Sequence, residues 1–324
     1  MHAKLEAILS GLGLDALLPA FLGHKIDDRL LAELNDHDLK EIGVEMIGDR
    51  KRLLMAFAPG SKMGFPVKAK AAPALTPAPQ ELPGGTRDKN PLLASQTQPF
   101  VNSLGMPFVP IPLGKTLFCV WQLRIRDYRQ YCVESGAAMP EADFPQEPDH
   151  PVVNVRWHDA RLFCEWLTKR EAGMIPGSMI YRLPRDEEWS VAVGLPHESG
   201  ATPKACSGVA EGYPWGGTFP PPPDAGNYHS RFGCGFHDTS PVGSFPPNKL
   251  GICDLGGNVW EWCIDQYEKS EDQRVVRGGS CFNDDPEFLM SSARNHFAPD
   301  HAQNNVGVRI VLTTSAGLDL WHRG

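Results

Sequence analysis

Apolar residues recur at helical spacing in five short runs over residues 4–58, and glycine or asparagine separates the runs. The runs are Leu5–Leu9, Leu17–Phe21, Leu30–Leu34, Leu39–Ile42 and Leu53–Phe57. Asn35 and Asp36 are candidate N-caps for the helix that holds Asp38, because short polar side chains accept hydrogen bonds from unpaired backbone amides there. The pattern predicts a small all-α domain of five helices, and periodicity alone is typical of any helical bundle.

Helical and strand patterns are mixed after residue 90. Helical spacing covers Ile125–Ser135, His158–Ala172 and Arg185–Val193. Short apolar runs predict strands at Phe108–Ile111, Phe118–Trp121, Val275–Val276 and Val308–Leu312. Long loops rich in glycine and proline fill residues 195–250. The mixture predicts an α+β domain on a small, loop-dominated sheet.

The two patterns are separated by a segment rich in proline and alanine, which cannot build a core. We therefore predict a helical domain over residues 1–60, a linker over 61–90 and the α+β domain over 91–324. A flexible linker of this length spans on the order of 30 Å, so it would position the two domains loosely.

Composition narrows the classes of partner and compartment. The net charge is −8 and no basic block occurs, which disfavours nucleic acid. No apolar run approaches the roughly 18 residues of a membrane span, and the N-terminus lacks the apolar core of a signal peptide. We expect a cytoplasmic protein with reduced thiols. None of the eight cysteines forms a C-x-x-C pair, which argues against structural zinc.

The residues of the first segment point to one helical family. Leu12-Gly-Leu14, Ile26-Asp27, Asp38-Leu39, Ile42-Gly-Val44 and Gly48-Asp-Arg50 together resemble the sterile alpha motif (SAM) family of protein–protein adaptors. Many such domains join head to tail, which would give open oligomers. The resemblance implies that an acidic middle surface meets a basic helix start in a copy of the chain or in another protein. The interface residues would be Asp27, Asp28, Asp38, Arg50, Lys51 and Arg52.

Three ordered signatures dominate the second segment: Gly251–Trp262, Arg277–Ser280 and Val306–Arg309. Earlier motifs precede them, at Pro151–Ala160 with Cys164–Leu167, Tyr181–Pro184 with Glu187–Trp189, Tyr213–Gly216, and Ser240–Val242 with Phe245–Asn248. Together they resemble the formylglycine-generating-enzyme (sulfatase-modifying factor) family, a variant of the C-type lectin fold, over residues 91–312. We expect five tryptophans to fill its core, namely Trp157, Trp189, Trp215, Trp260 and Trp262.

The resemblance implies a calcium site in the turn before Trp262. Its ligands would be the side chains of Asp254 and Glu261 and the carbonyls of Gly257 and Val259, a set that suits a hard cation. Alternatively, the two carboxylates only accept hydrogen bonds from amides of the turn. A second family site would use Asn227 with the carbonyls of Tyr228 and Phe236. We expect that site to be empty, because Cys234 stands where the family has a carboxylate.

Catalysis in the family depends on two cysteines that bind copper. Their positions fall on Asn283 and Phe288, and neither residue can form a thiolate or bind copper. Cys281 lies two residues early and has no cysteine five residues on. Related sulfoxide synthases bind iron through histidines of a helical domain, but His2, His24 and His37 lack ligand spacing. We predict a non-enzyme without copper; the alternative is an oxidoreductase of this family acting on a thiol.

Residues 281–303 set aromatic side chains among short polar ones, as antibody paratopes do. The segment also resembles the variable region of proteins diversified by retroelements, with a fixed frame at Pro286, Arg294-Asn295, Pro299-Asp300 and Asn304–Arg309. Non-diversified relatives share much of this frame. Alternatively, Phe288, Leu289 and Phe297 pack inward. The implied ligand-binding positions are Cys281, Phe282, Asn283, Asp284, Phe288, Met290, Asn295, His296, Phe297, Ala298, His301, Ala302 and Gln303.

These expectations combine into a bacterial, cytoplasmic recognition protein. A SAM domain would bind a copy of the chain or another protein, and residues 281–303 would bind a protein ligand. Proteins of this organisation resemble sensors of conflict systems that work with AAA ATPases and von Willebrand A-type partners. That last step is analogy at the level of domain organisation.

Overall fold

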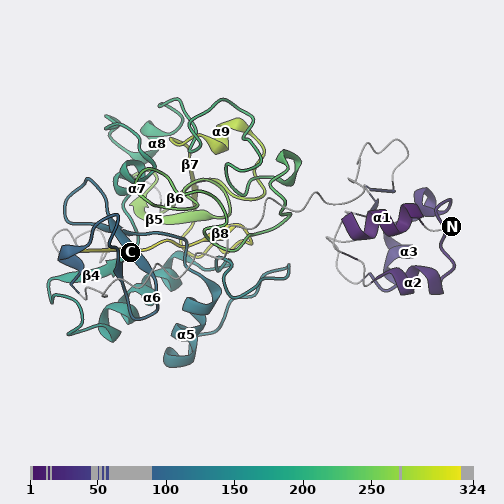
Figure 1. Cartoon of the computed structure of the whole chain (residues 1–324), viewed down its shortest axis with the longest axis horizontal. Helices are drawn as coiled ribbons and strands as arrows, with labels where there is room; N and C mark the ends of the chain where they lie inside the picture. Colours follow the sequence, from purple (N-terminus) through teal and green to yellow (C-terminus); the bar gives the residue numbers. More distant parts are fainter. Residues whose placement is uncertain are drawn as a thin grey trace. The chain divides into compact units, whose positions relative to one another are not determined.

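A computed structural model describes residues 3–11, 14, 17–44, 50, 53–54, 56–57, 90–269 and 272–314 (Figure 1). The chain divides into two compact units, residues 1–73 and 74–324. The predicted linker, apart from residue 90, lies outside the described residues, and so does the segment 315–324. No described helix is long and apolar enough to cross a membrane.

The first unit is helical, as its apolar spacing predicts. It contains α1 (Ala3–Gly11), α2 (Leu18–Gly23), the 3₁₀ helix η2 (Leu31–Glu33) and α3 (Asp36–Glu41). Residues of the predicted fifth helix are helical where they are described, at 50, 53–54 and 56–57. Leucines and the rings of Phe21 and Phe57 fill the core, and these rings meet edge to face at 6.2 Å.

Of the two candidate N-caps of α3, Asn35 is confirmed, and Asp36 is the first residue of the helix. Asn35 Oδ1 accepts hydrogen bonds from the amides of His37 (2.8 Å) and Asp38 (3.1 Å). In return, Asp38 Oδ2 accepts from the Asn35 amide at 2.9 Å, which completes a capping box. Asn35 therefore fixes where this helix begins.

The second unit holds two small sheets. The five-stranded sheet is antiparallel in the order β1-β2-β3-β9-β4, and the four-stranded sheet has the order β7-β6-β5-β8 with β5 and β8 parallel. The strands are β1 (Phe100–Val101), β2 (Pro107–Pro110), β3 (Leu117–Cys119), β4 (Met179–Arg182), β5 (Trp260–Gln266), β6 (Arg274–Arg277), β7 (Arg294–Phe297), β8 (Val306–Gly307) and β9 (Val311–Thr314).

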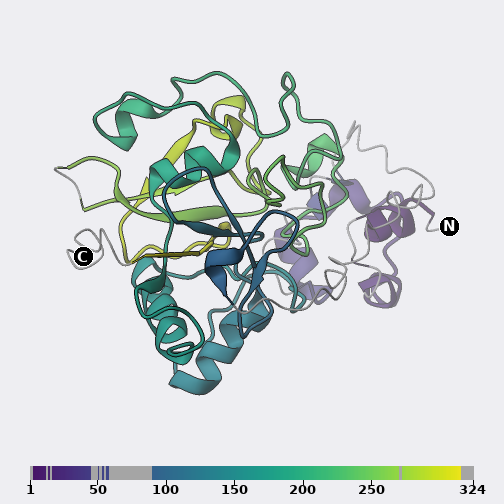
Figure 2. The ribbon, with the colours of Figure 1, turned by 60° about the vertical axis from the view of Figure 1, so that its left-hand side comes forward.

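Helices flank the two sheets on different sides. In Figures 1 and 2, α5 and α6 lie together at one end of this unit, and α7, α8 and α9 lie with the four-stranded sheet. The three predicted helices are confirmed, with α7 beginning after Arg185. Their bounds, with the shorter helices, are η3 (Pro91–Leu93), α5 (Ile125–Ser135), α6 (Trp157–Arg170), α7 (Asp186–Val193), α8 (Pro203–Cys206), η4 (Ser230–Phe232) and α9 (Pro286–Leu289).

One predicted strand is wrong in its bounds. The run Val308–Leu312 is not one strand, because β8 ends at Gly307 and β9 begins at Val311. Between them the side chain of Arg309 is fully buried and binds Glu261 on β5. The buried guanidinium of Arg309 thus interrupts the alternation of inward apolar and outward polar side chains that a single strand would show.

Four of the five predicted core tryptophans are buried: Trp157, Trp189, Trp260 and Trp262. Their rings fill a unit with little regular structure, and the indole of Trp157 donates to Cys263 O at 2.9 Å. The prediction is wrong for Trp215, which is half-buried and stacks on Tyr213 at 4.4 Å. Trp215 lines a surface pocket rather than the core.

Candidate recognition face

The predicted ligand-binding positions lie between β6 and β9, and the structure exposes nearly all of them. Twelve of the thirteen are exposed or half-buried. The exception is Cys281, whose residue is 1% exposed and whose backbone amide donates to Asn258 O at 2.9 Å. Cys281 therefore cannot contact a ligand directly, and that part of the prediction is corrected. We call the other twelve the recognition face: Phe282, Asn283, Asp284, Phe288, Met290, Asn295, His296, Phe297, Ala298, His301, Ala302 and Gln303.

The frame around this face is mostly buried. Arg294, Pro299 and the run from Asn305 to Arg309 are buried, whereas Pro286, Asn295, Asp300 and Asn304 keep some exposure. Backbone hydrogen bonds tie the frame to the core, because Trp157 N donates to Pro299 O at 3.0 Å and Trp260 N donates to Asn305 O at 2.8 Å. Asn305 Nδ2 also donates to Ser280 Oγ at 3.1 Å, which joins the two ends of the segment.

Two phenylalanines of the face point outward. Phe282 is 39% exposed and Phe288 is 43% exposed, although rings of this size are usually buried. Each touches a neighbouring ring at its edge, Phe282 that of Phe144 at 6.1 Å and Phe288 that of Trp260 at 6.3 Å. Of the residues that could have packed inward, Leu289 does so and is 1% exposed. Phe288 does not.

Stacked ring pairs continue the face along β7 and beyond it. His296 stacks on Tyr267 with ring centroids 4.0 Å apart, and Phe297 stacks on His301 at 4.3 Å. Phe297 is half-buried and its inner edge meets Trp262 at 6.1 Å. The rings are therefore held in place before any ligand arrives, which limits the entropy that binding would cost.

Residues outside the predicted segment also border the face, and sequence reasoning missed them. Arg231 on η4 pairs with Asp284 at 2.9 Å and donates to the carbonyl of Asp284 at 2.6 Å. The amide of His229 donates to Asn283 O at 3.2 Å. Phe144 and Tyr267 supply the neighbouring rings, and both lie outside residues 281–303 in the sequence. No local pattern could have linked them to it.

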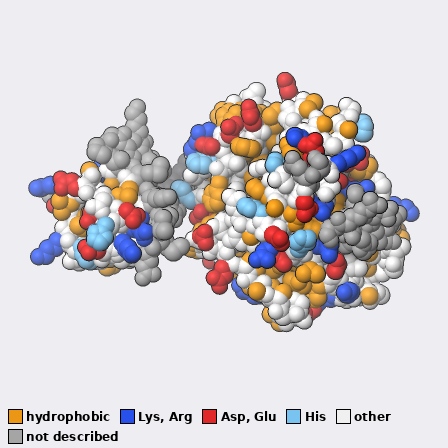
Figure 3. Space-filling view, turned by 180° about the vertical axis from the view of Figure 1, so that it is seen from behind, with side chains coloured by type: hydrophobic (Ala, Val, Ile, Leu, Met, Phe, Trp, Pro, Cys, Tyr) orange, Lys and Arg blue, Asp and Glu red, His pale blue; other side chains and the backbone are white. Residues whose placement is uncertain are grey.

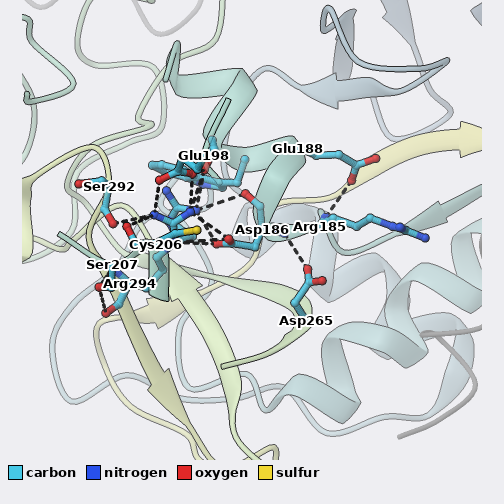
Figure 4. A network of polar contacts seen from close by, with 12 residues as sticks. Arg185, Asp186, Glu188, Glu198, Cys206, Ser207, Asp265, Ser292 and Arg294 are labelled. Carbon is cyan, nitrogen blue, oxygen red and sulfur yellow. Dashed lines mark hydrogen bonds and ion pairs between the residues drawn. The ribbon is translucent and has the colours of Figure 1, made fainter. Parts of the chain in front are cut away.

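A buried polar network anchors the middle of the segment (Figure 4). Arg294 Nη2 donates to Asp186 Oδ2 at 3.0 Å and to Glu198 Oε2 at 2.6 Å. Its Nη1 donates to the carbonyls of Cys206 at 3.0 Å and Ser292 at 2.8 Å. One guanidinium thus joins α7, the loop at Glu198 and α8 to the strand that carries the face.

A second guanidinium shares the same carboxylate. Arg277 Nη1 donates to Asp186 Oδ1 at 2.5 Å, and its other nitrogens donate to the carbonyls of Ser291 and Ala293. Burial alone would raise the pKa of Asp186, but Arg277 and Arg294 hold it below its ordinary value. The carboxylate therefore stays ionised, which a buried double ion pair requires.

The predicted calcium residues do come together in one turn. However, the carbonyls of Gly257 and Val259 face the side-chain amide of Gln122, and Glu261 binds Arg309. Asp254 Oδ2 accepts a hydrogen bond from the amide of Gly243 at 2.6 Å. Calcium binding in this turn stays a prediction. Among the described residues, no group of three or more His, Cys, Asp or Glu side chains is arranged to hold a metal.

Asn283 and Phe288, which were predicted to occupy the positions of the family's copper-binding cysteines, contact neighbouring residues of the loop and the core. Asn283 Oδ1 accepts from Ser280 Oγ at 2.7 Å, and Phe288 rests on Trp260. Nearby thiols are protonated, because burial raises the pKa of Cys281 and Cys263 well above the ordinary value. Burial thus disfavours a thiolate at Cys281 and Cys263.

In the SAM unit, three of the six predicted interface residues have internal roles. Arg50 is buried, and it donates to Asp36 Oδ1 at 2.8 Å and to Val44 O at 2.9 Å. Asp28 accepts from the amides at the start of α1, and Asp38 belongs to the capping box. Arg50 therefore has little surface left for a partner. The predictions for Lys51 and Arg52 lie outside the described residues.

Comparisons with known proteins agree with both domain resemblances. The model of the sulfatase-modifying factor enzyme 1-like domain matches residues 92–314, and the SAM (sterile alpha motif) model matches residues 5–58. Among solved structures, Treponema denticola variable protein 1 aligns with a TM-score of 0.44 and 20% identity over 60% of this chain and 84% of that chain. A likeness at that level carries no information on function.

Curated relatives include proteins named as inactive formylglycine-generating enzymes and proteins named as formylglycine-generating enzymes. Inactive C-alpha-formylglycine-generating enzyme 2 of Bos taurus is 34% identical over 190 residues, which cover 53% of each chain. Formylglycine-generating enzyme of Bos taurus is 29% identical over 196 residues, 52% of this chain and 46% of the relative. The chain thus spans about half the length of these relatives. Because the first family model covers well over half of its residues, the chain belongs to the sulfatase-modifying factor enzyme 1-like family.

Proposed function

We propose that this chain is a non-catalytic recognition protein, and that the recognition face binds a protein ligand. The observation that carries the proposal is the division between accessible and buried positions in one segment. The twelve face residues keep exposure, while Arg294, Pro299 and Asn305–Arg309 hold them from below. A rigid support beneath side chains that keep contact with solvent is what a binding surface needs.

The chemistry of the face suits a protein ligand. Exposed phenylalanines supply the large apolar contacts that dominate protein–protein binding energy, and Asn, Asp, His and Gln supply adaptable hydrogen bonds. On the side seen in Figure 3, acidic and basic side chains are interspersed among the described residues rather than gathered into one basic region. That distribution supports a protein partner over nucleic acid.

A lysozyme selection tests the binding role. The full chain is displayed with seven face positions randomised (Phe282, Asp284, Phe288, His296, Ala298, Ala302 and Gln303), and folded members are selected against hen egg-white lysozyme. We expect binders whose affinity disappears when those positions are returned to the residues of this chain. A library of folded members that yields no binder after repeated selection would overturn the proposal.

The alternative function is an oxidoreductase of this family acting on a thiol substrate. The residues at the copper positions, Asn283 and Phe288, and the protonated thiols nearby favour the non-catalytic role. The test is oxygen consumption by the full chain with Cu⁺ and a cysteine-containing sulfatase peptide. We expect no consumption above that of heat-denatured protein. Turnover would replace the recognition role with the enzymatic one.

The SAM domain would join the recognition domain to a second copy or to another protein, since adaptors of this family bind proteins. By analogy of domain organisation, AAA ATPases and von Willebrand A-type proteins are candidate partners. We also propose that residues 281–303 are diversified by a retroelement and that the protein is cytoplasmic. A near-identical, asparagine-rich copy of the DNA for residues 275–312, beside a reverse transcriptase gene, would test diversification.

A further inference from the structure

One side-chain nitrogen lies among four oxygens in the turn that was expected to bind calcium. Gln122 Nε2 is 3.3 Å from Asp254 O, 3.4 Å from Gly257 O, 3.2 Å from Val259 O and 3.0 Å from Glu261 Oε1. Gln122 is fully buried and precedes Leu123, whose amide donates to Val308 O at 2.7 Å. Backbone pairing therefore fixes the side chain that enters the turn.

The atom at the common focus of these oxygens is a hydrogen-bond donor. Oxygen ligands lie about 2.3 to 2.6 Å from calcium, whereas all four oxygens here stand at hydrogen-bonding distances from nitrogen. Gln122 Oε1 has no hydrogen-bond partner. Turning the amide over would set that oxygen against four others, so the nitrogen is the end that the ring selects.

The charge that calcium would balance is already balanced. Arg309 Nε donates to Glu261 Oε2 at 2.9 Å, and its Nη2 donates to Glu261 Oε1 at 2.7 Å. Trp189 Nε1 adds a third hydrogen bond to Glu261, at 2.8 Å. Arg309 Nη2 also donates to Asp254 O at 3.1 Å. A cation would have to enter beside this buried guanidinium, which would repel it.

The side chain of Asp254 does not join the ring. Its backbone carbonyl faces Gln122, while its carboxylate accepts from the amide of Gly243. One of the two carboxylates expected as calcium ligands is thus used to hold the loop at Gly243. The carboxylate that remains, Glu261, is the one paired with Arg309.

The second oxygen cluster predicted from the family shows the same arrangement. Cys234 Sγ lies 3.4 Å from Asn227 Oδ1, 3.3 Å from Tyr228 O and 3.4 Å from Phe236 O. A thiol is a weak hydrogen-bond donor and a poor ligand for a hard cation. In both clusters a neutral side-chain donor stands among the oxygens.

We propose that the Gln122 amide and the Arg309 guanidinium take the place of calcium in the turn 254–261, so that this domain folds and functions without the ion. Two N–H groups of Gln122 serve the carbonyls, and Arg309 supplies the positive charge. This proposal replaces the calcium prediction. It does not depend on what the recognition face binds.

Two measurements on the full chain test the proposal. First, Tb³⁺ is titrated as a calcium probe; an ion bound at Glu261 would lie beside Trp189 and show sensitised emission. Second, thermal unfolding is followed with 1 mM Ca²⁺ or with EGTA for the wild type, Gln122→Glu and Gln266→Glu. Gln122→Glu keeps the side-chain shape but sets a carboxylate against the ring. Gln266 is exposed at the end of β5 and provides the matched control.

The wild type and Gln266→Glu should show no saturable emission and the same melting temperature in calcium and in EGTA. Gln122→Glu should unfold at a lower temperature than the wild type in both calcium and EGTA, because its carboxylate oxygen then stands where the four ring oxygens need a donor. Saturable emission or a calcium-dependent melting temperature in the wild type would overturn the proposal. So would a Gln122→Glu variant that is as stable as the wild type in EGTA. If that variant does not fold, the wild-type titration still decides.

Discussion

Arg294 and Asp186 are 108 residues apart in the chain, yet Arg294 Nη2 lies 3.0 Å from Asp186 Oδ2 in the interior. The two residues that follow Arg294 on β7, Asn295 and His296, belong to the recognition face. An ion pair with α7 thus fixes the strand whose exposed side chains would meet a ligand. The recognition face is thus held by a buried ion pair that is not accessible to a ligand.

We predict that Arg294→Gln lowers the free energy of unfolding by about 3 to 5 kcal/mol, because it leaves Asp186 and Glu198 buried without a full partner. Denaturant unfolding of the full chain measures the loss. Arg231→Gln is the control, since its partner Asp284 is partly exposed and such a pair contributes about 1 kcal/mol or less. Equal losses for the two variants would contradict the anchoring role of Arg294.

Gly257→Ala should destabilise the protein far more than Gly251→Ala. Both glycines have positive φ, +83° and +79°, so alanine is strained at either by roughly 1 to 2 kcal/mol. At Gly257 the added methyl would also lie 2.5 Å from Asn227 O, whereas at Gly251 it meets nothing within 4 Å. Melting temperatures of the two variants provide the comparison. Similar values would mean that the turn can shift away from Asn227.

Asp265→Asn should gain stability relative to the wild type as pH rises. Burial of its carboxyl group raises the pKa of Asp265 to about 6, although the residue as a whole is half-buried. The folded state therefore binds this proton more tightly than the unfolded chain. That contribution is complete below about pH 4 and is lost as pH rises through 6.

Asparagine still offers an oxygen to the amide of Asp186, which donates to Asp265 Oδ2 at 2.7 Å. Because asparagine does not ionise, the difference in melting temperature between variant and wild type should grow from pH 5 to pH 8. A difference that is constant over this range would show that Asp265 titrates as it does in the unfolded chain.

The SAM unit should separate stability from association. Arg50→Gln should lower the stability of this unit, because Arg50 is buried against Asp36 and Val44. The double charge reversal Lys51→Glu, Arg52→Glu should instead abolish self-association and leave folding intact. Sedimentation velocity and circular dichroism of both variants measure the two effects. If the wild type is monomeric, the SAM unit does not self-associate, and binding to another protein is the role that remains.

Local sequence signals predicted the helices and where they begin and end, but not the tertiary contacts between them. The helix Ile125–Ser135 was predicted with its observed bounds, because amphipathic spacing marks its length and Gly136 ends it in the left-handed conformation. Asn35 likewise predicted the start of α3. These signals act within a few residues, and there sequence reasoning is strongest.

The contacts of the face and of the turn depend on loops that periodicity does not describe. Phe144 meets Phe282, and Gln122 enters the turn around Gly257, across more than 100 residues in each case. One sequence signal did point to Gln122, because it is the single polar residue in the apolar run Phe118–Leu123. Its partner could not be named, because the register between two loops is set only by the folded core.

Two matched libraries test the division of residues 281–309 into an accessible face and a buried frame. One randomises seven accessible positions: Phe282, Asp284, Phe288, His296, Ala298, Ala302 and Gln303. The other randomises seven buried frame positions: Arg294, Pro299, Asn305, Val306, Gly307, Val308 and Arg309. The measurement is the fraction of displayed full-length chains that resist protease. We predict that most members of the first library resist and almost none of the second. Equal sensitivity of the two libraries would show that the face is part of the core and contradict the account.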